Sequence, residues 1–129
     1  PISKGINSIY SDYAETASAN QKNLITIKCG TTAKVREYIY TTEGRLITNQ
    51  EDYKYQIGSN GSSIIENQLI DAKEGSVKII SIPSKEINLD KRLNELFTNK
   101  KINIDDVKAY ILIEKILTES EDKSIKCNK

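Results

Sequence analysis

The chain has 129 residues, of which 37% are hydrophobic and 29% are charged, the balance of a folded globular protein. This length is usual for one domain around one core, so we expect a single soluble domain over residues 1–129. Lys and Arg number 19 against 18 Asp and Glu, which argues against attraction of nucleic acid, anionic membranes or acidic substrates through net charge. Any electrostatic partner has to meet a local patch.

Apolar run lengths and cysteine spacing narrow the possible compartments. Uninterrupted apolar runs such as residues 110–113 are far shorter than the roughly 20 residues that cross a bilayer, so no membrane span is predicted. No signal-peptide pattern opens the chain, which leaves a cytoplasmic protein or one whose leader was removed before Pro1. Cys29 and Cys127 are too far apart for a redox CxxC pair or a zinc site. They form either one long-range disulfide, in a secreted, periplasmic or envelope-facing protein, or two thiols in the cytoplasm.

The first segment of the chain has a helical pattern. Apolar residues recur at steps of three and four, on one stripe that comprises Ile2, Ile6, Ile9, Tyr10, Tyr13 and Ala17. This spacing predicts an N-terminal helix at 2–18. Its serines and Gly5 lower helix propensity, so we expect it to depend on docking against the rest of the fold.

The next segment, residues 24–82, has the period of β-strands and predicts an antiparallel meander. Alternation predicts strands at 24–29, 35–40 and 53–57, with a turn at 41–44 that leads into residues 45–47. Asn60-Gly61 supplies the two positive-φ positions of a type I′ hairpin turn. Residues 63–73 fit either the returning strand or a helix with a capping box at Ser63, and the hairpin turn favours the strand.

Strand and helix signals alternate in the last part of the chain. A β-branched run predicts a strand at 77–82. A helix is predicted at 88–98, with Asn88 as its N-cap and a compact apolar stripe of Leu89, Leu93, Leu96 and Phe97. Residues 104–118 read as a strand with period two, with a helix as the alternative, and 119–129 read as a polar tail. The predicted class is therefore α+β: an antiparallel meander or sandwich of about six to seven strands, with an N-terminal helix and one helix near the C-terminus.

The chain has no His, which removes the commonest general base, metal ligand and pH switch. It contains no Gly-rich phosphate loop, and its acidic pairs at 51–52 and 105–106 lack the spacing of a calcium loop. We therefore predict no metal and no cofactor. A small enzyme stays an alternative, with Cys29 as a nucleophile or Pro1 as a base. An unblocked N-terminal proline acts as a base in the tautomerase family, which this chain resembles only in Pro1-Ile2.

The tyrosines are the strongest candidates for a binding site. Tyr38 and Tyr40 share one face of their predicted strand, Tyr53 and Tyr55 share one face of theirs, and Arg36 and Lys54 are interleaved with them. Tyr and Arg are enriched in the energetically dominant residues of protein interfaces, although one Tyr pair could instead line the core.

These patterns predict a non-enzymatic protein-interaction domain, such as an assembly subunit, adaptor or inhibitor, that binds through a tyrosine-bearing sheet face or an edge strand. A protein partner is expected, and self-association is compatible with such a surface. The alternatives are a module that binds single-stranded nucleic acid through the same tyrosines, which the net charge disfavours, and the small enzyme with Pro1 or Cys29.

Overall fold

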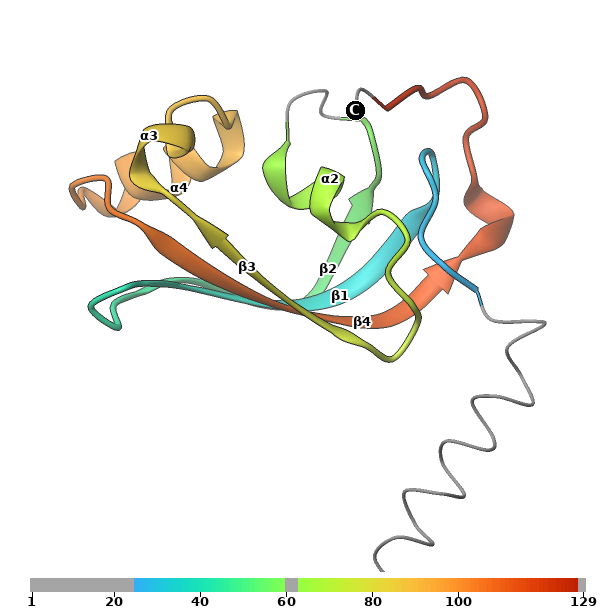
Figure 1. Ribbon diagram of the computed structural model, residues 1–129, viewed down its shortest axis with the longest axis horizontal. Coiled ribbons are helices and arrows are strands. Elements are labelled where there is room, and N and C mark those ends of the chain that lie inside the picture. Colours follow the sequence, from blue (N-terminus) through green and yellow to red (C-terminus); the bar gives the residue numbers. More distant parts are fainter. Residues whose placement is uncertain (1–24, 60–62, 128–129) are drawn as a thin grey trace, which may run out of the picture.

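The computed structural model of the protein describes residues 25–59 and 63–127. Four antiparallel strands form a sheet in the order β2-β1-β4-β3, and three short helices lie on one side of it (Figure 1). In chain order the elements are β1 (Thr32–Thr41), β2 (Leu46–Gln56), α2 (Ile64–Leu69), β3 (Val77–Ile82), α3 (Ser84–Ile87), α4 (Lys91–Lys100), β4 (Val107–Leu117) and the 3-10 turn η2 (Thr118–Ser120). The helix predicted at 2–18, Pro1 and the Asn60-Gly61 turn lie outside the described residues.

The predicted meander or sandwich of six to seven strands is wrong, because the described residues form four strands. Three differences account for this. Residues 25–29 make only an isolated bridge, Thr26 opposite Lys73. The strands expected at 45–47 and 53–57 are the two ends of one strand, β2, of 11 residues. Residues 64–69 are a helix, and β3 pairs with β4 at the far edge instead of following β2.

Strands β1 and β2 form a hairpin that is closed at Thr41. The amide of Gly44 donates to the Thr41 carbonyl at 2.8 Å, and the Thr41 hydroxyl accepts from the Arg45 amide at 3.0 Å. Gly44 has a φ of +90°, which suits glycine because it has no Cβ to clash there. The register shifts between Val35 and Glu37 and between Ile39 and Tyr40, and such irregularities increase the local twist of a strand pair.

Helix α2 replaces the strand predicted at 63–73, because local capping outweighs the hairpin signal. The Ser63 hydroxyl accepts from the Glu66 amide at 3.2 Å, as expected of an N-cap serine. The Glu66 carboxylate accepts from the Gly58 amide at 2.7 Å, which ties the helix to the end of β2. The helix buries Ile65 and Leu69 against the sheet. A strand would have placed these residues, four apart, on one face together with polar Asn67.

The helix predicted at 88–98 is present as α4, but it begins three residues later. Its N-cap is Asp90 and not Asn88, which ends α3 instead. One Asp90 oxygen accepts from the Leu93 amide at 3.1 Å and the other from the Ile64 amide at 2.9 Å, so this carboxylate joins the starts of α4 and α2. Among the described residues no helix is long and apolar enough to cross a bilayer.

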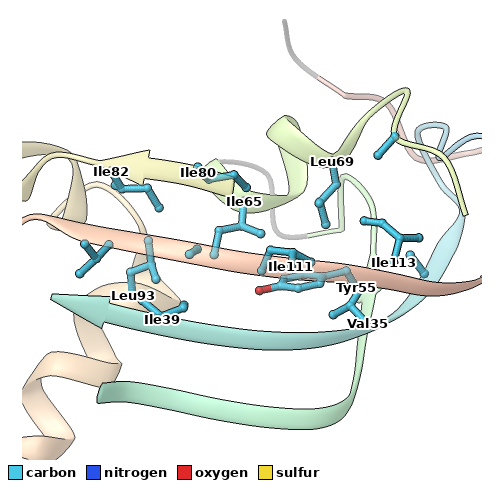
Figure 2. Packing of buried hydrophobic residues seen from close by; sticks show 14 of the residues in the cluster. Val35, Ile39, Tyr55, Ile65, Leu69, Ile80, Ile82, Leu93, Ile111 and Ile113 are labelled. Atoms are coloured by element: carbon cyan, nitrogen blue, oxygen red, sulfur yellow. The ribbon is translucent and has the colours of Figure 1, made fainter. Parts of the chain in front are cut away.

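The core lies between the sheet and the helices (Figure 2). The strand predicted within 104–118 is present as β4, whose inward side chains alternate as the period-two pattern requires: Val107, Ala109, Ile111 and Ile113. Figure 2 shows Ile111 of β4 facing Ile65 of α2, with Ile80 of β3 beside them. Burial of these aliphatic side chains, roughly 1.5–3 kcal/mol each, is the main favourable contribution to folding.

The segment after β4, predicted as a polar tail, is anchored to the start of the fold. The Asp122 amide donates to the Gly30 carbonyl at 2.9 Å, and the sulfurs of Cys29 and Cys127 are 2.15 Å apart, at disulfide distance. Gly30 has a φ of +88°, and a Cβ there would overlap the Asp122 carbonyl oxygen. Only glycine allows the tail this close approach.

Candidate functional site

One face of the sheet is not covered by any helix of the described chain (Figure 1). Burial alternates along β1, so that Val35, Glu37 and Ile39 are buried on the helix side, while Arg36 and Tyr38 alternate with them on the other side. The same alternation along β3 and β4 places further aromatic and aliphatic side chains on this side. We call this side the open face and define it by Arg36, Tyr38, Tyr40, Val77, Ile79, Tyr110 and Leu112.

The strand registers bring the residues of the open face into rows across the sheet. Tyr38 pairs with Tyr110, and Tyr110 pairs with Ile79, which forms one apolar row over β1, β4 and β3. Arg36, Leu112 and Val77 form the next row in the same way. Ile79 is 63% exposed and Val77 56% exposed, so this apolar surface is open to solvent at the β3 edge. The open face is therefore a continuous patch and not a set of isolated side chains.

An aromatic hollow lies at the hairpin end of the open face. The rings of Tyr40 and Tyr110 have centroids 6.3 Å apart and tilt by 48°. Together with Gly44, Lys108 and neighbouring threonines they line an open depression of about 430 Å³. Leu46, opposite Tyr40 in the register, is 40% exposed. A hollow between two tyrosines suits an aliphatic or aromatic side chain of a partner.

Two cations on this side of the sheet, Arg36 and Lys34, lie beside acids. The Arg36 Nε lies 3.2 Å from Glu114 Oε2, and the Lys34 Nζ lies 3.2 Å from Asp52 Oδ1. Exposed pairs of this kind contribute little stability, but they cancel the local positive field. The open face is therefore mainly aromatic and aliphatic, with Arg36 paired to an acid and Lys108 beside the hollow.

The second predicted tyrosine pair lies on the opposite side of the sheet, so the predicted site is divided. Tyr55 is only 3% exposed and belongs to the core, and Tyr53 packs edge-on against it with ring centroids 4.7 Å apart. Lys54 alternates with them, so its side chain lies on the other side of β2, opposite Lys34 of β1. Of the predicted binding residues, Arg36, Tyr38 and Tyr40 share the open face, while Tyr53 and Tyr55 do not.

Tyr53 and Tyr55 belong to a buried ion-pair cluster, defined by Glu37, Tyr53, Tyr55 and Arg92. Glu37 is fully buried, and its carboxylate accepts from Arg92 Nη2 at 2.5 Å, from Nη1 at 3.1 Å and from the Tyr55 hydroxyl. The Arg92 guanidinium lies 4.2 Å from the centre of the Tyr53 ring, within cation–π range. Each charge is thus matched within the cluster, which is typical of a structural ion pair.

The buried Tyr55 hydroxyl makes the stability of the fold sensitive to alkaline pH. Burial raises the pKa of Tyr55 well above its usual value, and the negative charge of Glu37 raises it further. In the unfolded chain the phenol ionises near pH 10, about the ordinary value, whereas in the fold it stays neutral. The contribution of Tyr55 to the free energy of unfolding is therefore complete below about pH 10 and is lost as the pH rises toward the folded-state pKa.

We expect guanidinium unfolding midpoints to fall as the pH rises above about 10, with a slope from this group of up to about 1.4 kcal/mol per pH unit. Tyr55→Phe removes the titrating hydroxyl and should flatten that part of the profile, although it lowers stability at neutral pH. An equal alkaline slope in Tyr55→Phe and wild type would show that other groups cause it.

The cysteines offer no free thiol for catalysis, since both belong to the described residues and their sulfurs are paired. The structure therefore removes the support for Cys29 as a nucleophile, while Pro1 lies outside the described residues. Within ranges 25–59 and 63–127 no group of three or more His, Cys, Asp or Glu residues could hold a metal ion.

Sequence reasoning missed Val77, Ile79, Tyr110 and Leu112 of the open face, and Glu37 and Arg92 of the ion-pair cluster. A usable signal existed for the first group, because these residues occupy the alternate phase of strands that were correctly predicted. Glu37 and Arg92 are 55 residues apart, and no local pattern connects them. Neither a protein-family model nor a curated protein sequence matches the chain.

Proposed function

We propose that this chain is a non-enzymatic interaction domain that binds a protein partner through the open face of its sheet. The observation that carries the proposal is the row of Tyr38, Tyr110 and Ile79, an aromatic and aliphatic strip that no described helix covers. Contiguous apolar patches are uncommon on soluble monomers and mark binding surfaces. Tyr and Arg in such a patch are the residue types that dominate interface energetics.

Charge and chemistry support this proposal over its two rivals. Single-stranded nucleic acid requires several cations that are free to meet phosphates, and because Arg36 and Lys34 each face an acid, Lys54 and Lys108 are the cations of this side left to do so. An enzyme that uses Cys29 would need a thiolate, and its sulfur is paired with that of Cys127. The cysteine pairing also supports a location in an oxidising compartment, secreted or periplasmic, where disulfides persist.

The test substitutes one residue of the open face and one matched residue outside it. Tyr38→Lys places a charge in the middle of the apolar row, and Leu89→Lys places the same charge at a position that is 71% exposed between α3 and α4. Proteins that crosslink to the wild-type chain in extracts of its source cells are identified by mass spectrometry, and their affinities for the purified variants are then measured.

Tyr38→Lys should lower the affinity for the identified partner by about 30-fold, which corresponds to the loss of an interface residue that contributes about 2 kcal/mol. Leu89→Lys should leave the affinity unchanged. Because Leu89 is exposed and Tyr38, though half-buried, lies outside the core, unfolding midpoints should stay close to wild type. Equal affinities of both variants would overturn the proposal. Tight, steeply salt-dependent binding of a single-stranded oligonucleotide that Tyr38→Lys leaves intact would also contradict it.

A further inference from the structure

Strand β3 forms one edge of the sheet, and its outer side has no partner strand among the described residues. It pairs with β4 only, in unbroken register from Val77 opposite Leu112 to Ile82 opposite Val107. The other edge strand, β2, has two register shifts and an exposed acidic stretch at Glu51 and Asp52. Bulges and charges of this kind protect an edge from pairing with another chain. β3 has no bulge, and Lys78 is its one charged residue.

The hydrogen-bond phase of β3 determines which of its backbone groups point outward. At its start, the Ile113 amide of β4 donates to the Ser76 carbonyl at 2.9 Å, so residue 76 faces β4. In an antiparallel ladder this orientation alternates from residue to residue. The backbone N–H and C=O groups of Lys78, Ile80 and Ile82 therefore also point toward β4. The N–H and C=O groups of Val77, Ile79 and Ser81 point away from the sheet.

The side chains of these same three residues lie on the open face, because they alternate with buried Ile80 and Ile82. Ile79 and Val77 are 63% and 56% exposed, so the unpaired backbone edge coincides with exposed β-branched side chains. Such an edge is a template for an added strand. Pro83 follows β3 directly, and because proline has no N–H it limits the added pairing to this short stretch.

We propose that β3 pairs antiparallel with β3 of a second copy of the chain, about a two-fold axis at Ile79. In this register Ile79 lies opposite Ile79, and Val77 lies opposite Ser81, so each outward-pointing residue meets another outward-pointing residue. The three pairs form about six backbone hydrogen bonds, two for each pair. The two sides of a two-fold interface are the same surface, so that surface has to be complementary to itself. The β3 edge meets this condition, because the outward-pointing N–H and C=O groups of one copy pair with the same groups of the other.

The same register suits the side chains. Lys78, whose side chain is on the helix side, lies opposite Ile80 of the other copy, so the two lysines do not face each other directly. On the open face, Ile79 of one copy contacts Ile79 of the other, and the row Tyr38–Tyr110–Ile79 continues across the axis. The two sheets become one sheet of eight strands, and the two open faces form one apolar surface. This inference does not depend on the proposed partner of the open face.

The first test is the mass of the full chain in solution, measured by sedimentation from micromolar to millimolar concentration. Wild type should shift from a 14.5 kDa species to twice that mass as concentration rises. Ile79→Lys places two like charges at the axis and should weaken association at least tenfold, whereas Leu89→Lys and Tyr38→Lys should dimerise like wild type. A wild type that stays monomeric at millimolar concentration would overturn the proposal, as would an Ile79→Lys variant that dimerises equally well.

The second test checks the register itself. Under mild oxidation Ile79→Cys should form a covalent dimer rapidly, because paired residues have Cβ atoms about 5 Å apart. Val77→Cys should not crosslink to itself, since its two copies are four residues apart along the strands, about 13 Å. A mixture of Val77→Cys and Ser81→Cys chains should crosslink. Equal rates for Ile79→Cys and Val77→Cys alone would show that the chains meet in another way.

Discussion

Arg92→Met is expected to lower the free energy of unfolding by about 3 kcal/mol. This value is near the lower end of the cost of breaking a buried ion pair, because the Arg92 side chain is 22% exposed to solvent. The fully buried Glu37 carboxylate would lose both guanidinium bonds and keep only the Tyr55 hydroxyl. Methionine retains most of the aliphatic length, so the lost charge and not a cavity dominates the effect. Urea unfolding at neutral pH measures it.

Two comparison variants separate this effect from a general effect of removing an arginine. Arg36→Met removes a half-exposed pair with Glu114, whose side chain is 26% exposed against none for Glu37, and should cost less than Arg92→Met, about 1 kcal/mol. Glu37→Leu combined with Arg92→Met removes both buried charges and should recover most of the stability lost in Arg92→Met alone. If the double variant is no more stable than the single one, the penalty does not come from an unpaired charge on Glu37.

Those parts of the fold that depend on local alternation could be predicted from the sequence. β3 and β4 follow period-two patterns of Ile, Val and Ala, and α4 follows a three-to-four spacing that ends in buried Leu93 and Phe97. Strand order could not be predicted, because the pairing of β3 with β4 depends on packing between segments far apart in the chain. At 63–73 two local signals compete, and the Ser63 cap together with the buried contacts of Ile65 and Leu69 decides for the helix.

The candidate site could be predicted only in part, for a similar reason. Alternation places Tyr38 and Tyr40 on one face of β1 and Tyr53 and Tyr55 on one face of β2, but it does not say which face meets the helices. On β1 the core face holds Val35 and Ile39 and also Glu37, whose buried charge is matched by Arg92 of α4. A sequence pattern cannot show that pairing, so the buried tyrosines resembled a binding surface.

Substitution of both cysteines by serine is expected to lower the free energy of unfolding by about 4 to 5 kcal/mol. The disulfide spans 98 residues, nearly the whole described chain, and closing a loop of that length restricts the unfolded state by about this amount. Hydrogen bonds from the tail to Gly30 stay possible without it, but they then have to fix the tail against its own chain entropy. The substituted chain should therefore lose order at 121–127 first, which hydrogen exchange would detect as loss of protection at the Asp122 amide.

Wild type treated with a reductant should reproduce the unfolding midpoint of the double-serine variant, and the variant itself should not respond to reductant. Ser124→Ala is a control that changes the tail but keeps the disulfide. It removes the hydrogen bond from the Ser124 hydroxyl to Asp122 and should change the free energy of unfolding by less than about 1 kcal/mol. If wild type and the double-serine variant unfold at the same urea concentration, the cross-link does not stabilise this fold. The tail would then be held by its other contacts, with Gly30 and Gly58, and one reason for placing the protein in an oxidising compartment would disappear.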